Sequence, residues 1–129
     1  MSIEMQMLAW TIVLVVIQIV IAATLSVSQR GLGWAAGPRD GTPLQLTGIA
    51  GRMERALRNM LETFPLFAAA VLAVIAIQHT NAHTALGAQL YFWARLAYVP
   101  AYAVTLPYVR TLVWAVSLVG LIMVVSGLF

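Results

Sequence analysis

The feature that most constrains this chain is an uncharged apolar run from Leu8 to Ser28, LAWTIVLVVIQIVIAATLSVS. A helix of this length crosses about 30 Å of hydrocarbon while its backbone groups satisfy one another. Composition extends the argument, because 62% of the 129 residues are hydrophobic and only 9% are charged. Soluble domains carry about 25% charged residues, so the sequence predicts an integral membrane protein without a separate soluble domain.

A cleaved signal peptide is the competing interpretation of this first run. The residues before it include Glu4 and no Arg or Lys. A signal peptide has a positive start and a shorter apolar core. We therefore expect the run at about 8–28 to remain as the first membrane span.

Three further spans are expected after one substantial loop. The segment 30–47 is rich in glycine and proline and is predicted to be that loop. The remaining spans are predicted at about 48–79, 84–106 and 108–128, with Pro107 in the first turn of the last helix, where its missing N–H costs nothing. The sequence thus predicts an all-α membrane protein whose single domain, 1–129, is a four-transmembrane-helix bundle.

The arginines indicate the orientation. Arg30, Arg39 and Arg52 flank the first loop and Arg110 follows the last turn, while the opposite ends hold no Arg or Lys. We therefore expect the 30–47 loop in the cytoplasm and both termini outside. All seven basic residues are arginines, which together with the compact loops favours a multi-pass protein of a bacterial inner membrane. A net charge of +3 without a run of like charges argues against a nucleic-acid partner.

A polar stripe begins the second predicted span. Arg55, Asn59 and Glu62 are four and three residues apart and share one helix face, with Arg58 on its flank. Glu54 and Glu62 each lie four residues from Arg58, so pairing within the helix accounts for that arginine. Pairing leaves Arg55 and Asn59 without partners, which favours a ligand or subunit interface over a merely solvated face.

A second polar stripe occupies the third predicted span, where Arg95, Tyr98 and Tyr102 are three and four residues apart. We expect Arg95 to form a structural ion pair with Glu62. Three other aromatic side chains are interpreted as anchors at the membrane interface. They are Tyr91, Tyr108 and Trp114.

The predicted topology brings the polar residues of four helices to the cytoplasmic half of the membrane. Arginine donors, one carboxylate and two phenols at one depth suit a small polyanionic ligand that also carries an amine. They are Arg30, the Arg55–Glu62 stripe, Tyr98, Tyr102 and Arg110. No metal site is expected, because the chain has no cysteine and His79 and His83 lie at a turn without an acidic or thiol partner.

Two stretches resemble one known family, the membrane-associated proteins in eicosanoid and glutathione metabolism (MAPEG). Residues 55–67, RALRNMLETFPLF, look like the family's R-A-x-x-N-x-x-E-x-x-P-x-F signature. Residues 92–102, FWARLAYVPAY, followed by Arg110, are similar to the family's third and fourth helices, especially in the leukotriene C4 synthase and microsomal glutathione S-transferase branch. Thr63 and Trp114 stand where relatives of two branches have tyrosine, which leaves the substrate unassigned.

The resemblance implies a homotrimer that binds glutathione, as co-substrate, between adjacent subunits. It implies that Glu62 takes the amino group, that Arg30 contacts a carboxylate and that Arg110 stabilises the thiolate. The other glutathione-binding residues that it implies are Arg55, Arg58, Asn59, Tyr98 and Tyr102.

Two function classes follow from the resemblance. The favoured one is a glutathione-dependent membrane transferase or peroxidase that acts on lipophilic electrophiles reaching it through the lipid. The alternative is a non-enzymatic scaffold of the same fold, which binds lipid or serves as an accessory subunit of a larger membrane complex.

Overall fold

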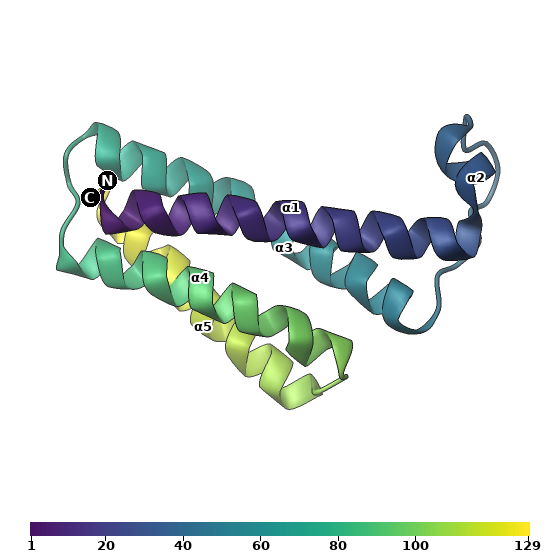
Figure 1. The fold of residues 1–129 in the computed structure, drawn as a ribbon. Coiled ribbons are helices and arrows are strands. Elements are labelled where there is room, and N and C mark those ends of the chain that lie inside the picture. The colour runs from purple at the N-terminus through teal and green to yellow at the C-terminus, as the bar shows by residue number, and fades with distance from the viewer.

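The computed structural model describes residues 1–129, which form five α-helices and no strand. Four helices are long and one is short (Figure 1). They are α1 (Ile3–Arg30), α2 (Leu32–Ala36), α3 (Gly48–Ala76), α4 (Ala82–Ala103) and α5 (Pro107–Ser126). The all-α prediction is confirmed, and the correction is α2, a helix of five residues inside the segment predicted to be a loop.

Three helices, α1, α3 and α5, are each long and apolar enough to cross a membrane. Helix α4 has a comparable length of 22 residues, but Gln89 and the buried Arg95 interrupt its apolar sequence. The lengths and compositions of these three helices are those of an integral membrane protein, and α4 is the one long helix that is not apolar enough to join them.

The four long helices alternate in direction and are inclined to one another (Figure 1). Both termini and the α3–α4 turn lie at one end, and α2 and the α4–α5 turn lie toward the other. Helix α4 packs most extensively on α5, and α1 packs most extensively on α3. At the end that carries α2, the start of α3 and the α4–α5 turn diverge.

Buried aromatic and aliphatic side chains join α3 to α4 and α5. The Phe67 and Tyr91 rings stack with centroids 4.0 Å apart, and the Tyr91 hydroxyl lies 2.8 Å from the Thr63 hydroxyl. Tyr91 is fully buried, so its predicted role as an interfacial anchor is wrong. A tyrosine is buried without penalty where its hydroxyl finds a partner, as it does here.

The end of the molecule that carries the termini is closed by polar contacts. The buried Glu4 carboxylate accepts a hydrogen bond of 2.5 Å from the Thr84 hydroxyl. Asn81 and Thr84 form a capping box at the start of α4. His79 Nδ1–H donates to the Gly127 carbonyl at 3.1 Å, which ties the α3–α4 turn to the end of α5.

Candidate functional site

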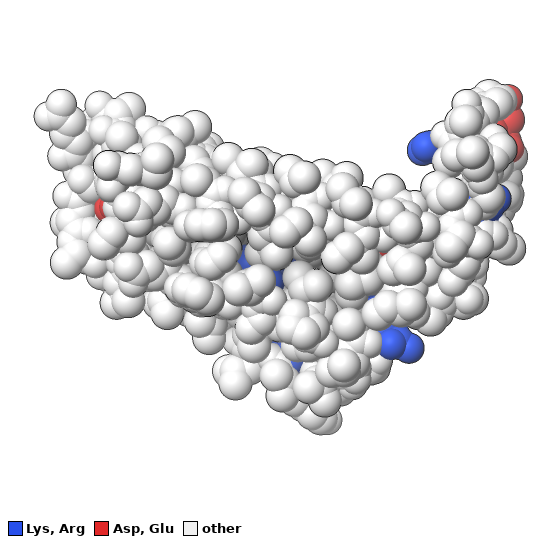
Figure 2. Space-filling model, viewed as in Figure 1, with Lys and Arg blue, Asp and Glu red and all other residues white.

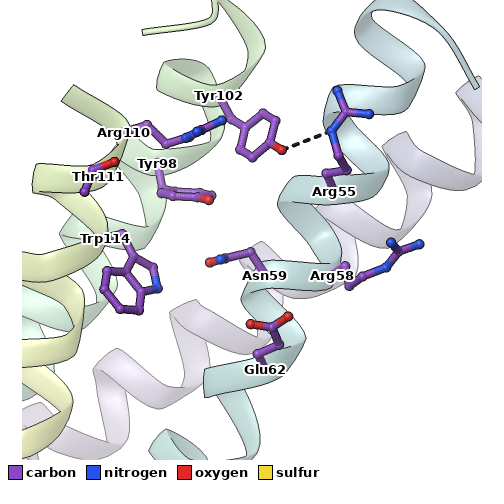
Figure 3. Close-up of a pocket in the computed structure, with 9 residues that line it drawn as sticks. All are labelled: Arg55, Arg58, Asn59, Glu62, Tyr98, Tyr102, Arg110, Thr111 and Trp114. Atoms are coloured by element: carbon purple, nitrogen blue, oxygen red, sulfur yellow. Dashed lines mark hydrogen bonds between the residues drawn. The ribbon is translucent and has the colours of Figure 1, made fainter. Parts of the chain in front are cut away.

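A pocket of about 420 Å³ opens between α3, α4 and α5 at the end where these helices diverge (Figure 3). Seven of its nine lining residues are residues that the sequence analysis selected as site candidates. The lining consists of Arg55, Arg58, Asn59, Glu62, Tyr98, Tyr102, Arg110, Thr111 and Trp114. The structure therefore brings the two predicted polar stripes together in one cavity.

Helix α3 presents its polar stripe as one wall of the pocket (Figure 3). Arg55 Nε donates to the Tyr102 hydroxyl at 3.0 Å, which fixes the upper edge of the pocket. Further along the helix, Glu62 forms no ion pair and no hydrogen bond within the chain. The pocket thus contains a carboxylate that is free to accept from a ligand.

Helices α4 and α5 form the opposite wall with aromatic rings and one arginine. The Arg110 guanidinium carbon lies 4.6 Å from the centre of the Tyr102 ring, a cation–π contact. The Tyr98 and Tyr102 rings meet edge to face with centroids 5.7 Å apart. Arg110 has no carboxylate within ion-pair distance, so its charge is available to an anion in the pocket.

The α4–α5 turn places Arg110 beside Tyr102. Helix α4 ends with Thr105 in the left-handed region (φ 59°) and with a hydrogen bond from Leu106 N–H to the Ala101 carbonyl. Pro107 then starts α5, where its fixed φ suits the first turn. Arg110 therefore projects from the first turns of α5 toward the last turn of α4.

The prediction that Arg58 pairs with glutamates of its own helix is confirmed in part. Its Nη2 lies 3.0 Å from Glu54 Oε1, four residues earlier. Glu54 also lies 3.9 Å from Arg30 Nη2. The predicted second partner, Glu62, takes no part in this cluster.

Arg30 is a candidate that the structure places outside the main pocket. It lines a smaller neighbouring cavity of about 220 Å³, together with Glu54 and the flanks of Arg55 and Arg58. Its Nε donates to the Leu44 carbonyl at 2.7 Å, so this arginine also holds the loop that precedes α3.

Arg95 does not form the ion pair that the sequence analysis predicted. Its Nη1 donates to Asn59 Oδ1 at 2.9 Å, and its Nε lies 3.2 Å from Met60 Sδ. Glu62 lies almost one turn beyond Asn59 on α3 and forms no ion pair. Arg95 is only 1% exposed, and the register of α4 against α3 directs its guanidinium to Asn59.

Sequence reasoning missed two lining residues on α5, Thr111 and Trp114. Trp114 was interpreted as an interfacial anchor, but it lies in the pocket wall (Figure 3). Its position four residues after Arg110 puts both on one helix face, and this spacing is the signal that could have found it. Tyr108, by contrast, is exposed.

Charges are scarce outside this region. On the face drawn in Figure 2, most of the surface is uncharged. His79 lies between α3 and α4 and His83 lies in the first turn of α4, at the end of the molecule that carries the termini. No group of three metal-ligating side chains occurs. The concentration of arginines around one cavity is therefore the main polar feature of the molecule.

Comparison with known proteins gives one match. No curated protein and no solved structure matches the chain. The model of the MAPEG family matches residues 7–129, which is nearly the whole chain and includes every residue of the pocket. The protein therefore belongs to the MAPEG family of integral membrane proteins in eicosanoid and glutathione metabolism.

Proposed function

We propose that the pocket binds glutathione and that the protein is a glutathione-dependent membrane transferase or peroxidase. One observation carries the proposal: unpaired groups of opposite charge line the same cavity. Glu62 and Arg110 each lack an ion-pair partner, and the Asn59 amide nitrogen makes no hydrogen bond within the chain. Polar groups in a membrane helix normally find partners, so a ligand that supplies them is favoured.

Glutathione has the chemistry that these groups require. Its ammonium group suits Glu62, and its carboxylates suit the guanidinium forks of Arg55 and Arg58. The cavity volume of about 420 Å³ falls in the range of small-ligand sites. Arg30, in the adjoining cavity, is proposed to contact a second carboxylate.

Arg110 is the proposed catalytic residue. A guanidinium stays protonated, and beside a thiol in a site of low dielectric constant it favours the thiolate. The N-terminal turns of α5 add the positive end of a helix dipole. The thiol proton leaves to solvent, the thiolate sulfur forms a bond to an electrophilic carbon, and the leaving group departs with its electron pair.

The membrane setting favours lipophilic electrophiles, because α5, which forms one wall of the pocket, also carries exposed apolar side chains. Trp114 lines the pocket, and the next turns of α5 are apolar. We further propose that α4 is a fourth span, since it packs along α5 in an antiparallel pair. The resulting four-helix bundle is proposed to assemble as a homotrimer whose interfaces cover the exposed apolar side chains of α1.

A binding and rate experiment tests the proposal. Glutathione at 100 times its dissociation constant should stabilise the detergent-solubilised protein by roughly 2.7 kcal/mol. Arg110→Ala should lower the rate of conjugation to an aromatic halide by about 10²–10³-fold, the usual loss when a group that stabilises a reacting anion is removed. It should leave binding within a few-fold, because Glu62 and Arg55 remain.

Arg39→Ala is the matched control, because this arginine lies in the exposed loop outside the pocket. It should leave both the rate and the binding unchanged. Absence of stabilisation and of conjugation in the unmodified protein would contradict the proposal.

An apolar groove favours the second candidate, a non-enzymatic scaffold that binds lipid. The groove, of about 400 Å³, lies between α4 and α5 and is lined by seven hydrophobic residues and Gln89. A scaffold of this kind would bind an acyl chain there and would show no stabilisation by glutathione. The thermal measurement therefore separates the two functions.

A further inference from the structure

We propose that Arg95 is a positioning residue that fixes the Asn59 amide so that its N–H donors, and not its oxygen, face the ligand. The proposal rests on the glutathione site proposed above and assigns that site's specificity. It concerns a residue that does not line the pocket.

The first observation is the burial of Arg95 without a counter-ion. The side chain is 1% exposed, and no carboxylate lies within ion-pair distance. A buried guanidinium is costly unless its donors are satisfied. Its contacts to Asn59, Met60 and the Tyr98 ring, whose centre lies 4.3 Å from the guanidinium carbon, are therefore the interactions that hold it.

The second observation is that two of these three partners belong to the pocket lining, namely Asn59 and Tyr98. Arg95 lies behind both and joins the α3 wall to the α4 wall. A change at Arg95 should therefore reach the ligand through side chains that touch it.

The two ends of the Asn59 amide are in different situations. Nη1 of Arg95 donates to Oδ1 at 2.9 Å, and Nδ2 makes no hydrogen bond within the chain. Arginine has donors only, so turning the amide over would place N–H against N–H. The bond to Arg95 therefore leaves Asn59 as a donor toward the pocket.

Specificity follows from the neighbouring residue on the same wall. Asn59 presents donors, and Glu62, three residues later, presents acceptors. This pair selects a ligand in which an ammonium group lies beside a carboxylate or carbonyl oxygen, as at the amino-acid end of glutathione. A ligand with only anionic groups would satisfy Asn59 and be repelled by Glu62.

Asn59→Asp tests the orientation directly. The new carboxylate keeps an acceptor for Arg95 but replaces the N–H donors with a second negative oxygen. We expect this variant to unfold at the same temperature as the unmodified protein or higher, and to bind glutathione at least tenfold more weakly. Unchanged affinity would overturn the proposal.

A double-mutant cycle tests the role of Arg95 itself. Arg95→Met should weaken glutathione binding about tenfold in the otherwise unmodified protein and have little effect in an Asn59→Ala background. If Arg95 were purely structural, Arg95→Met would weaken glutathione binding by the same factor in both backgrounds. That result would overturn the proposal.

Arg95→Lys keeps the test decisive if the methionine variant fails to fold. Lysine retains the charge and a donor for Asn59 Oδ1. The affinity of the Arg95→Lys protein for glutathione should therefore stay within a few-fold of that of the unmodified protein. If Arg95→Lys weakens glutathione binding tenfold or more, the positioning role is wrong. If the unmodified protein binds no glutathione, the proposed function itself fails and the positioning role fails with it.

Discussion

At the scale of single residues, Glu62 is the side chain whose situation is hardest to explain without a ligand. It lies within α3, lines the pocket and has no cation partner. A carboxylate that belonged only to the fold would be expected to pair, as Glu54 does with Arg58 at 3.0 Å. The contrast between these two glutamates, eight residues apart on one helix, makes Glu62 the residue to test.

Glu62→Gln should weaken glutathione binding about 10–100-fold, because a hydrogen bond to a charged group contributes about 1.5–3 kcal/mol. The thermal stability of the free protein should not fall, since the carboxylate has no partner to lose. Isothermal titration and thermal unfolding give the two readings. Asp40→Asn, which removes an exposed carboxylate outside both cavities, is the control, and equal weakening of binding by both variants would contradict a specific role for Glu62.

The sequence predicted which residues form the site, but it could not predict which of them contact one another. Spacings of three and four along each helix identified Arg55, Asn59, Tyr98 and Tyr102, which the structure brings together. Such spacings carry no information on how far one helix slides along its neighbour. For that reason Arg95 was assigned to Glu62, whereas it contacts Asn59.

At the scale of helices, the close approach of α4 and α5 depends on two glycines. A Cβ atom at Gly120 would lie 2.5 Å from the Gly87 carbonyl oxygen and 2.7 Å from the Tyr91 backbone nitrogen. Both neighbours are backbone atoms, which cannot move aside as a flexible side chain can. Small residues allow this kind of contact between helices in membranes.

Gly120→Ala should therefore destabilise the protein by about 1–3 kcal/mol, the usual cost of overpacking. Chemical or thermal unfolding in detergent measures the loss. Gly33→Ala in α2 is the control, because a Cβ atom there meets nothing within 4 Å. A Gly120→Ala protein as stable as this control would show that α4 and α5 are not held at the distance observed.

The sequence predicted the presence of each long helix better than it predicted the residues at which the helices end. The apolar runs located all four long helices, but two were predicted to extend three residues too far, to 79 and 106, whereas they end at Ala76 and Ala103. In both cases a residue without a turn signature, Gln78 or Thr105, adopts φ 59° just after the helix. Glycine or asparagine would have marked these ends.

At the scale of the whole molecule, the two ends differ in charge. The end with the termini buries Glu4 against Thr84. At the other end, with α2 and the α4–α5 turn, Arg30 ends α1, Arg39 follows α2, and Arg52 and Arg110 lie in the first turns of α3 and α5. Clusters of arginine beside membrane spans stay in the cytoplasm. The pocket would then open toward the cytoplasmic supply of glutathione.

Single cysteines can test this orientation, because the chain contains none of its own. Thr42→Cys places a thiol in the exposed segment between α2 and α3, and His83→Cys places one in the exposed first turn of α4. In intact cells a membrane-impermeant maleimide should label only the His83→Cys protein, and permeabilised cells should show both labelled. The unmodified chain is the blank. Labelling of Thr42→Cys alone in intact cells would invert the orientation and place the pocket away from cytoplasmic glutathione, which would argue against the proposed enzyme as well.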